Sequence, residues 1–388
     1  MKRKESVIKK MKILYITTIG VTMNFFCSFI RSQLDIGNQI DIATNENNGK
    51  NEVPVCYREW RCRVFHIDTS RSPISFGNIR AIKQIRDIVS KNHYDIVHCH
   101  TPLASMATRL ACKELRKNGL KVIYTVHGFH FYDGAPLKNW LIYYPVEKLL
   151  SKYTDVLITI NKEDYKRAKN NFYSNRIEYV PGVGIDTKKF NIIDREKRRN
   201  IRLKKRKELG IPDNSFLITS VGELSKNKNH SIIINAISEI KDHEVHYVIA
   251  GRGEYENELM YIINKLDLNQ QVHLIGQRND VSDLYACSDV CAFPSIREGQ
   301  GLAAIEGMAS SLPLIVADNR GLRGIINDGN AFICKYNDTR AFCDAIMNLK
   351  NNRQLCKEMG KNNWALSKMF DIHTINKQMG ELYDEYRR

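Results

Sequence analysis

The sequence lacks the paired cysteines of a zinc site. Its ten cysteines are scattered over 388 residues, and none stands in a CxxC pair. The closest spacings, Cys56 with Cys62 and Cys287 with Cys291, have no matching second half elsewhere in the chain. Buried thiols in a reducing cytoplasm account best for this cysteine usage.

The sequence also lacks a short-period repeat, a low-complexity tract and a long uninterrupted apolar run. Residues 13–30 carry no charge and follow the basic start Met1–Lys12, which resembles a signal anchor in outline. Three threonines, an asparagine, a serine and a glycine dilute this segment, and no small-residue cleavage site follows it. We therefore expect the first strand, turn and helix of a soluble domain, at Ile13–Thr18, Gly20 and about Met23 to Leu34.

The composition, with 43% hydrophobic and 26% charged residues, is that of a soluble protein. A chain of 388 residues is too long for one ordinary core. Its net charge of +16 lies in the first half. Residues 1–200 hold 35 lysines and arginines against 19 aspartates and glutamates, and the remainder holds 24 of each sign. Such a half favours nucleic acid, phospholipid or a phosphorylated acceptor, although solubility alone would give the same composition.

Short apolar runs alternate with helical patterns along the chain, which predicts an α/β protein with mainly parallel, doubly wound sheets. After the first strand, the strands expected in the first half are Ile40–Ala43, Arg63–Ile67, Ile96–His100, Val122–Val126 and Val156–Ile160. A second series follows the charged run Asp194–Glu208, with strands at Phe216–Val221, Val245–Ala250, Val272–Ile275, Val290–Phe293 and Leu314–Val316. Two Rossmann-like halves in tandem are therefore predicted, joined within Asp186–Pro212 and followed by helices from Thr339 to the end.

Ligands of open α/β sheets bind beyond the carboxyl ends of the strands, which selects the loops to inspect. In the first half, Gly20 is a lone glycine rather than a full GxGxxG motif. His127 stands at a strand tip before Gly128, where it could bind a substrate hydroxyl or simply lie in a surface loop. His98 and His100 share one strand face with no third ligand evident, so lining or structural roles are expected rather than a metal site.

In the second half, four strand-end loops carry glycine and polar residues. One runs from Gly222 to Asn229 and places Lys226 and Lys228 to meet a phosphate, although lysines near a helix start are commonly just solvated. Two others are Gly251-Arg252-Gly253 and Gly276-Gln-Arg278-Asn-Asp280. Their convergence on one sheet edge is stronger evidence for a site than any single loop.

The fourth loop is Ser295–Ser310, in which Gly299 and Gly301 precede a helix-like run. Free N–H groups and the helix dipole at such a start favour an anion. Glu298 in the loop and Glu306 about one turn into the helix could accept paired hydrogen bonds from the hydroxyls of sugars or riboses. The pattern predicts a site for a sugar attached to a phosphate, whereas a glycine-rich connection capped by an acid would look the same.

With Glu298 and Glu306 in an E-x7-E spacing, the chain resembles the family 4 glycosyltransferases. These are retaining enzymes of the GT-B fold, in which two tandem Rossmann-like domains border a cleft. Supporting motifs are Gly222 with Lys228, Gly251-Arg-Gly253, Val126-His127-Gly128 and Val180-Pro-Gly-Val-Gly-Ile-Asp186. The resemblance covers nearly the whole chain and is most similar to bacterial capsule and exopolysaccharide enzymes. It implies an acceptor domain at 1–195, a nucleotide-sugar donor domain at 196–370, and a C-terminal helix at 371–388 that crosses back to the first domain.

The resemblance also implies a role for each matching residue. His127 and Glu298 would form the catalytic site beside the transferred sugar, and Glu298 would bind the hydroxyls of that sugar. Glu306 would bind the nucleotide ribose. Lys228 would neutralise the diphosphate, and Gly20 would let the backbone of the first half approach it. The sugar and the diphosphate would also contact the backbone of Gln300, Gly301 and Leu302.

One position departs from the family pattern, because Glu223 stands where the family usually has an arginine that contacts phosphate. A carboxylate beside a diphosphate is unfavourable unless it is turned away or paired, for example with Lys226. Either Lys228 shares the phosphate with Arg252 or Arg278, or the site is weakened. No DxD-type metal site is evident and no cofactor is expected, because lysine and the helix dipole would supply the positive charge.

The expected function is transfer of a sugar from a nucleotide-sugar, with UDP as the expected nucleotide, to a lipid-linked saccharide during synthesis of capsule, exopolysaccharide or another cell-surface glycan. The basic first half fits an acceptor with a lipid diphosphate at an anionic membrane, so we expect a cytoplasmic enzyme, peripheral on the inner face of the plasma membrane. Two alternatives are a sugar-nucleotide epimerase of the same fold and a non-catalytic, degenerate subunit. Nucleic-acid binding would rest on charge alone, and no nucleic-acid partner is expected.

Overall fold

The computed structural model describes residues 10–387, except residues 48, 50, 71, 73, 74 and 193. Most of the basic start Met1–Lys12 therefore lies outside the described residues. The chain divides into two compact units: unit 1 is Met1–Val183 with His373–Arg388, and unit 2 is Gly184–Ile372. The C-terminal segment thus belongs to the same unit as the N-terminal half.

Unit 1 is built on a seven-stranded sheet in the order β3-β2-β1-β4-β5-β6-β7. Every strand pairing given for it is parallel. The interior strand β4 is buried along its whole length, as is typical of a strand in a sheet covered on both faces. The strands are β1 (Lys12–Ile19), β2 (Gln39–Asn45), β3 (Val64–His66), β4 (Ile96–His100), β5 (Lys121–Val126), β6 (Val156–Thr159) and β7 (Arg176–Tyr179).

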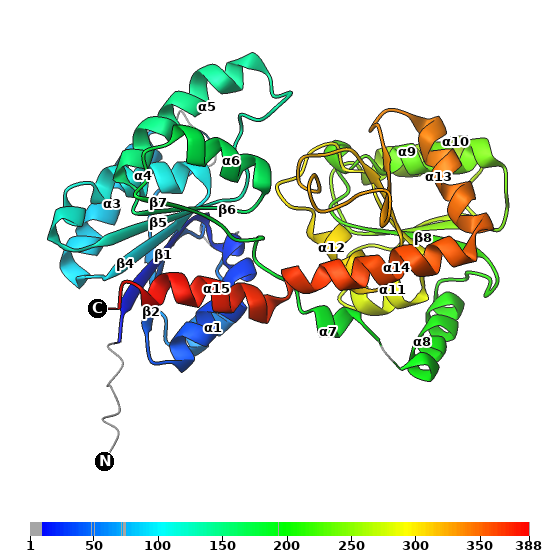
Figure 1. The fold of residues 1–388 in the computed structure, drawn as a ribbon, viewed down its shortest axis with the longest axis horizontal. Helices are drawn as coiled ribbons and strands as arrows, with labels where there is room; N and C mark the ends of the chain where they lie inside the picture. The colour runs from blue at the N-terminus through cyan, green and yellow to red at the C-terminus, as the bar shows by residue number, and fades with distance from the viewer. Residues whose placement is uncertain are drawn as a thin grey trace, which may run out of the picture. The chain divides into compact units, whose positions relative to one another are not determined.

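Helices cover both faces of this sheet and form a separate apolar core on each (Figure 1). One core receives α3 and α4, and the other receives α1 and α15. The elements are η1 (Gly20–Phe26), α1 (Cys27–Asp35), α2 (Val55–Glu59), α3 (Gly77–Asn92), α4 (Pro102–Cys112), η2 (Leu115–Asn118), α5 (Leu137–Leu150), η3 (Ser151–Tyr153), α6 (Lys162–Asn171) and α15 (Ile372–Asp384). The uncharged segment 13–30 is thus a strand, a 3-10 turn and the start of a helix. Among the described residues, no helix is long and apolar enough to cross a membrane.

The C-terminal helix α15 is fixed to unit 1 by polar contacts as well as by apolar packing. Tyr383 Oη lies 2.5 Å from His98 Nδ1 and 2.8 Å from Tyr15 Oη, both on the central strands. Gln378 donates a hydrogen bond to the Tyr179 carbonyl at 2.8 Å. The last helix therefore completes the core of the first unit.

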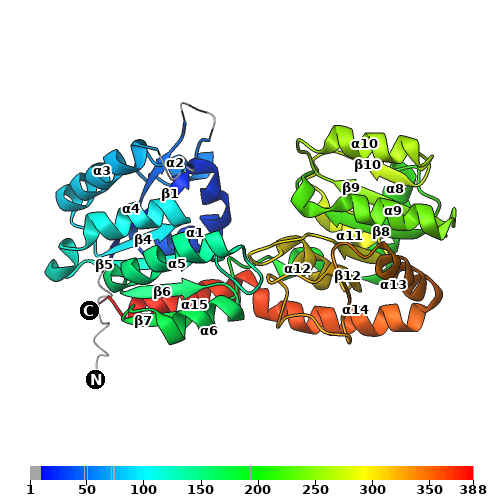
Figure 2. The same ribbon diagram turned by 90° about the horizontal axis from the view of Figure 1, so that it is seen from above.

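Unit 2 repeats the plan with a six-stranded parallel sheet in the order β10-β9-β8-β11-β12-β13, part of which Figure 2 shows. One face carries α9, α10 and α13, and the other carries α7, α11 and α12. The strands are β8 (Phe216–Val221), β9 (Val245–Ala250), β10 (Val272–Leu274), β11 (Val290–Phe293), β12 (Leu314–Ala317) and β13 (Ala331–Cys334). The helices are α7 (Thr187–Phe190), α8 (Arg195–Glu208), η4 (Lys226–Lys228), α9 (His230–Ile240), α10 (Glu256–Lys265), α11 (Val281–Cys287), α12 (Leu302–Ala309), α13 (Thr339–Asn351), α14 (Arg353–Ser367) and η5 (Lys368–Phe370).

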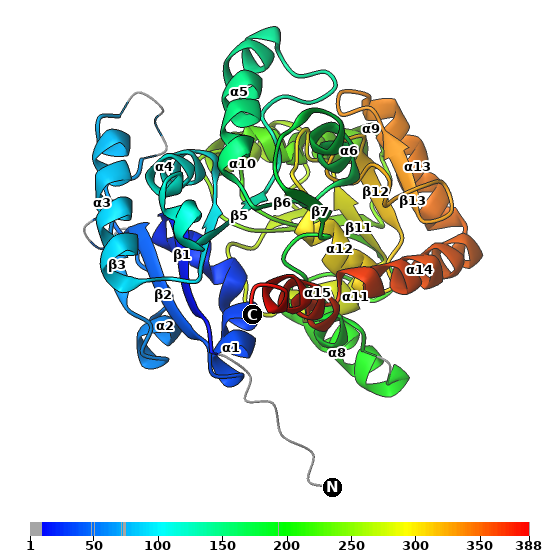
Figure 3. The same cartoon turned by 60° about the vertical axis from the view of Figure 1, so that its left-hand side comes forward.

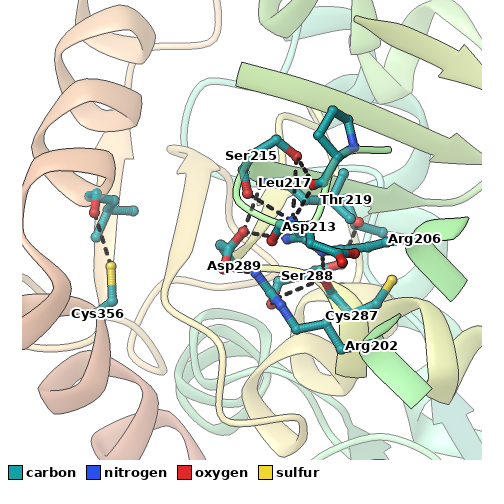
Figure 4. A network of polar contacts seen from close by, with 12 residues as sticks. Arg202, Arg206, Asp213, Ser215, Leu217, Thr219, Cys287, Ser288, Asp289 and Cys356 are labelled. Carbon is teal, nitrogen blue, oxygen red and sulfur yellow. Dashed lines mark hydrogen bonds and ion pairs between the residues drawn. The ribbon is translucent and has the colours of Figure 1, made fainter. Parts of the chain in front are cut away.

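The charged run before the second sheet is a helix of unit 2 rather than a connection between domains. Asp194 caps α8 by accepting hydrogen bonds from two backbone N–H groups. Arg206, which is fully buried, donates to Asp289 Oδ2 at 2.7 Å and to the Ser215 carbonyl at 2.8 Å (Figure 4). Arg202 donates to the other oxygen of Asp289 at 2.9 Å. These contacts anchor α8, so the chain divides at Val183 and Gly184, before the expected boundary at residue 195.

With this revised division, most of the excess of basic residues still lies in unit 1. Unit 1 contains 32 lysines and arginines against 19 aspartates and glutamates, and unit 2 contains 27 against 24.

In each sheet the chain order reverses once, between β1 and β4 in unit 1 and between β8 and β11 in unit 2. Loops at such reversal points form the usual ligand site of doubly wound sheets. The candidate site residues lie in these loops and in the strand-end loops beside them, except Leu302 and Glu306, which lie on α12.

Candidate functional site

The loops after β8 and β11, which flank the reversal point of unit 2, are hydrogen-bonded to each other. Ile296 N–H donates to the Asn227 carbonyl at 2.8 Å, and the Asn227 side chain donates to the Arg297 carbonyl at 2.9 Å. Asn229 adds a bond to the Pro294 carbonyl at 3.3 Å. Because these bonds join the two backbones, residues 70 positions apart in sequence share one surface.

Lys228 and Glu298 meet on this surface. Lys228 Nζ donates to Glu298 Oε1 at 2.7 Å, and the two side chains retain 21% and 17% of their exposed area. Lys228 Nζ also lies 5.5 Å from the ring centroid of Phe293, the last residue of β11. The structure therefore brings together the residues predicted to contact the diphosphate and the sugar.

The loop after β9 packs its backbone directly against the loop after β8. Gly222 N–H donates to the Ala250 carbonyl and Leu224 N–H to the Arg252 carbonyl, both at 3.0 Å. A Cβ added at Gly251 would lie 1.8 Å from the Gly222 carbonyl oxygen, so only glycine fits there. The exposed Arg252 is thereby held beside the loop that carries Lys228.

Arg278, in contrast, is occupied by two carboxylates. Its guanidinium lies 2.7 Å from Asp280 Oδ2 and 2.6 Å from Glu208 Oε1, and Lys205 pairs with the same two acids. Asp280 and Glu208 hold the pKa of Arg278 above its usual range. This network fixes the end of α8 to the loop after β10, which weighs against Arg278 as a phosphate ligand.

The start of α12 is the backbone at which anion binding is predicted from the sequence. Gly301 caps the helix with φ of 84°, a left-handed conformation in which a Cβ would also lie 3.1 Å from Leu322 and Phe293. Gln300, just before it, is buried, and Leu302 is the first helical residue. The N–H groups at such a start lack partners within the helix.

The loop after β12 supports this helix start and was not among the residues selected from the sequence. A Cβ at Gly321 would lie 2.9 Å from Glu298 Cβ, so this glycine lets the two loops touch. The side chain of Asn319 donates to the Ser295 carbonyl at 3.2 Å. The run Asp318-Asn-Arg-Gly321, composed of turn-forming residues after a strand, was the available signal.

Glu306 and Glu223 differ in their surroundings. Glu306 is half-buried on α12, and burial raises its pKa to about 7, against an opposing effect of Lys189 on α7. Its carboxyl group therefore titrates near neutral pH.

Glu223 is exposed, and no ion pair joins it to Lys226 among the described residues. Of the two arrangements expected for Glu223, exposure fits the structure better than pairing with Lys226.

In unit 1, His127 belongs to a cluster of three histidines at the ends of β4 and β5. His127 Nε2 lies 3.2 Å from His100 Nδ1, and the rings of His100 and His98 are 4.2 Å apart. Phe26 stacks on His100 at 4.1 Å. Burial lowers the pKa of His127 to about 4 and that of His98 to about 3, so both rings are neutral at neutral pH.

Gly20 and a cavity mark the reversal point of unit 1. A Cβ at Gly20 would lie 2.2 Å from the Asn51 carbonyl oxygen, so a contact within unit 1 already requires glycine there. Its approach to a diphosphate stays a prediction. A cavity of about 430 Å³ opens nearby, between the ends of β1 and β4 and the helix α5. Its lining includes Thr18, Thr101, Leu103, Met106, Ile142 and Val146.

Two family profiles together cover most of the sequence. Residues 12–161 match the family described as glycosyl transferase 4-like, and residues 201–364 match the family described as glycosyl transferases group 1. Putative glycosyltransferase EpsD of Bacillus subtilis is 36% identical over 97% of each chain. An Escherichia coli UDP-Gal:alpha-D-GlcNAc-diphosphoundecaprenol alpha-1,3-galactosyltransferase is 31% identical over 81% of this chain and 82% of that relative.

Solved structures share the fold at lower identity. Anabaena HepE in complex with UDP has a TM-score of 0.80 at 19% identity, over 97% of this chain and 100% of that one. The lipopolysaccharide glycosyltransferase WaaG has a TM-score of 0.72 at 16% identity, over 95% of this chain and 99% of that one. Both the resemblance inferred from the motifs and the two-domain α/β fold are confirmed. The chain therefore belongs to the GT-B glycosyltransferases of polysaccharide biosynthesis, with a glycosyl transferase 4-like half followed by a group 1 half.

Proposed function

We propose that this glycosyltransferase moves a sugar from a UDP-sugar to a lipid-linked saccharide, with retention of the anomeric configuration. The proposed binding of the donor rests on one observation: Lys228, Glu298 and the start of α12 share a surface at the reversal point of unit 2. This surface combines a cation, a carboxylate and the N-terminal backbone of a helix, which are the partners required by a diphosphate that carries a sugar.

In this proposal the two glutamates bind different parts of the donor. Glu298 orients the sugar hydroxyls from the loop, while Glu306 accepts hydrogen bonds from the ribose. Lys228 and the exposed Arg252 neutralise the leaving diphosphate, and the backbone of Gln300, Gly301 and Leu302 holds it at the helix start. Positive charge supplied by side chains and a helix dipole fits a reaction that needs no metal.

Two comparisons support UDP and a lipid acceptor. HepE, which shares the fold, has been solved with UDP and with UDP-glucose. The E. coli relative is named for a UDP-galactose donor and a diphosphoundecaprenol acceptor. A lipid diphosphate is anionic and membrane-bound, and the basic composition of unit 1 is complementary to it. We therefore assign the acceptor to unit 1, beside His127, and the enzyme to the inner surface of the plasma membrane.

The test is a donor screen with a lipid-diphosphate-linked saccharide as the acceptor. Release of nucleotide would be measured for UDP-, GDP- and ADP-sugars with and without this acceptor, and the product would be identified by mass spectrometry. The proposal predicts acceptor-dependent release from one UDP-sugar and a product with the anomeric configuration of the donor. Conversion of the nucleotide-sugar without an acceptor would instead identify an epimerase. The absence of both reactions would identify a binding subunit.

A further inference from the structure

Helix α5 of unit 1 exposes five large apolar side chains. Leu137, Leu141 and Ile142 retain 73%, 70% and 58% of their exposed area, and Leu149 and Val146 retain 55% and 41%. We call these five residues the α5 face. Figures 1 and 3 show α5 at the edge of unit 1. Clustered exposed apolar side chains of this kind mark contact surfaces rather than ordinary solvent-exposed positions.

The opposite side of α5 packs against the core of unit 1. The exposed face of α5 is therefore not the face that the helix uses for packing within the unit. Trp140, Tyr143 and Tyr144 pack against the apolar core of unit 1. Glu147 pairs with the fully buried Arg109 of α4 at 2.9 Å. Rolling the helix to bury its outer leucines would separate this ion pair inside the protein, which is strongly unfavourable. The structure therefore holds the α5 face outward.

Three lysines lie on α5 or directly after it. Lys138 and Lys148 lie on the helix, and Lys152 follows it in η3. Lys148 and Lys152 lie 5.5 and 5.0 Å from the ring centroid of Tyr173, which is itself exposed. The single acid in the helix, Glu147, points inward to Arg109. Leucines, an interfacial tyrosine and lysines without acids are the composition of a helix that lies on an anionic bilayer.

Other occupants fit this surface less well. At about 1.5 Å per residue, a helix of 14 residues is about 21 Å long, too short to span a bilayer. A second copy would meet the same patch across a two-fold axis and oppose lysine to lysine. An acidic peptide would satisfy the lysines but would not require five outward apolar side chains.

The cavity at the reversal point of unit 1 adjoins the same helix. Ile142 and Val146 belong to the α5 face and also line the cavity, whose other walls include Thr18 and Thr101. Contact between the α5 face and a bilayer would thus bring lipid next to the end of the sheet where an acceptor is expected.

We propose that the α5 face docks onto an anionic phospholipid surface, with the apolar side chains in the interface and Lys138, Lys148 and Lys152 at the headgroups. The inference deepens the proposed function and rests on it for the lipid-linked acceptor. Docking itself can be measured without sugar transfer, so the two proposals can fail separately.

The test is flotation of the full chain with vesicles of phosphatidylcholine alone or mixed with phosphatidylglycerol. Wild type is expected to bind the mixed vesicles at least about tenfold more tightly than the neutral ones. Leu141→Asp with Leu149→Asp should reduce binding to mixed vesicles by about tenfold or more. Lys148→Glu with Lys152→Glu should remove most of the preference for phosphatidylglycerol and most of the effect of salt on binding.

Matched controls come from α10 of unit 2, where Met260 is exposed and Lys265 lies 6.0 Å from the Tyr261 ring. Met260→Asp and Lys265→Glu should bind vesicles as wild type does, and every variant should retain the cooperative thermal unfolding of wild type as a check of folding. The proposal is overturned if wild type does not float with mixed vesicles or if the α5 variants float equally well. Loss of a dimer in the α5 variants, with vesicle binding unchanged, would assign this face to a second copy instead.

Discussion

Lys228 Nζ donates a hydrogen bond to Glu298 Oε1 at 2.7 Å, so the cation assigned to the diphosphate is held by the carboxylate assigned to the sugar. The pair is partly exposed and contributes about 1 kcal/mol or less to stability. A diphosphate that binds Lys228 competes with Glu298 for the same ammonium group. Release of Glu298 from Lys228 would then leave the carboxylate available to the sugar hydroxyls.

Glu298→Gln should therefore separate nucleotide binding from transfer. Loss of the competing carboxylate is expected to leave UDP affinity unchanged or to raise it by up to about tenfold, since that factor corresponds to about 1.4 kcal/mol. Transfer should fall by about 100-fold or more because an orienting group of the reacting sugar is lost. Calorimetry with UDP and a transfer assay measure the two effects. Glu258→Gln, at an exposed acid of α10, is the control, and unchanged transfer in Glu298→Gln would refute the role of Glu298.

UDP affinity should rise as the pH increases through about 7, where Glu306 ionises. The ionised carboxyl accepts hydrogen bonds from both ribose hydroxyls, whereas the protonated form uses one oxygen to carry its proton. Calorimetry at about pH 6 and about pH 8 measures the rise, and Glu306→Gln, which cannot titrate, should lose the part of it due to Glu306. The same rise in wild type and Glu306→Gln would show that the titration belongs to UDP or to another group.

The same shift predicts how Glu306 affects stability in the absence of donor. The folded-state pKa lies above the unfolded value of about 4.3, so the stabilising contribution is complete below that pH and is lost as the pH rises through about 7. Wild type should lose more thermal stability than Glu306→Gln between about pH 6 and about pH 8. A wild-type melting temperature that falls no further than that of the variant would contradict a half-buried Glu306 that titrates near pH 7.

Acid should destabilise unit 1 through its histidine cluster. Burial lowers the folded-state pKa of His127 to about 4, below the unfolded value of about 6.5. The contribution to stability is therefore present above about pH 6.5 and is lost as the pH falls through about 4. His127→Gln should weaken the acid dependence of the melting temperature between those values. The same acid dependence in wild type and His127→Gln would contradict a buried, neutral His127.

Gly251→Ala should disturb the donor site without removing a functional side chain. The new Cβ would lie 1.8 Å from the Gly222 carbonyl oxygen and would push apart the loops that carry Lys228 and Arg252. We expect UDP affinity to fall by about tenfold or more, because a misplaced ligand loop loses one or more charge-assisted hydrogen bonds of about 1.5–3 kcal/mol each. The control is Gly380→Ala in α15, where the Cβ meets only a side-chain atom at 3.8 Å. That change should be neutral or should stabilise the helix by up to about 1 kcal/mol.

Asp289→Ala should be among the most destabilising single changes in unit 2. Asp289 pairs with Arg202 and Arg206 and accepts a hydrogen bond from Leu217 N–H at 2.8 Å (Figure 4). Removing it leaves the buried guanidinium of Arg206 without its carboxylate, a change that costs about 3–5 kcal/mol in comparable pairs. The unfolding transition of unit 2 in guanidinium chloride measures this loss. Asp318→Ala removes an exposed pair with Arg323 and should change stability by about 1 kcal/mol or less.

The alternation of apolar runs predicted the fold because parallel strands that are covered on both faces are mostly apolar. Strand β4 occupies Ile96–His100, as expected from the sequence, and β8, β9 and β11 also match their predicted ranges. The edge strands β7 (Arg176–Tyr179) and β13 (Ala331–Cys334) were missed. β7 includes charged residues, and β13 is only partly buried, so neither shows the apolar pattern of an interior strand.

The division between units was misplaced for a different reason. The run Asp194–Glu208 is so rich in charge that it suggested a linker, but its inward arginines are neutralised by Asp289, which lies about 80 residues further along the chain. Local composition carries no information about such a partner. The same limit applies to Arg278, whose pairing with Glu208 depends on where α8 packs. Strand-end loops were more informative, because the order of strands in the sheet brings Lys228 and Glu298 together.

The most direct test of the donor site compares UDP affinity and sugar transfer in wild type, Glu298→Ala and Glu306→Ala. We expect Glu306→Ala to weaken UDP binding by about tenfold to about 100-fold, because hydrogen bonds to a charged group are worth about 1.5–3 kcal/mol. Glu298→Ala should retain UDP binding and lose transfer. Equal UDP affinity in wild type and Glu306→Ala, or undiminished transfer in Glu298→Ala, would contradict the assignment of one glutamate to the ribose and the other to the sugar.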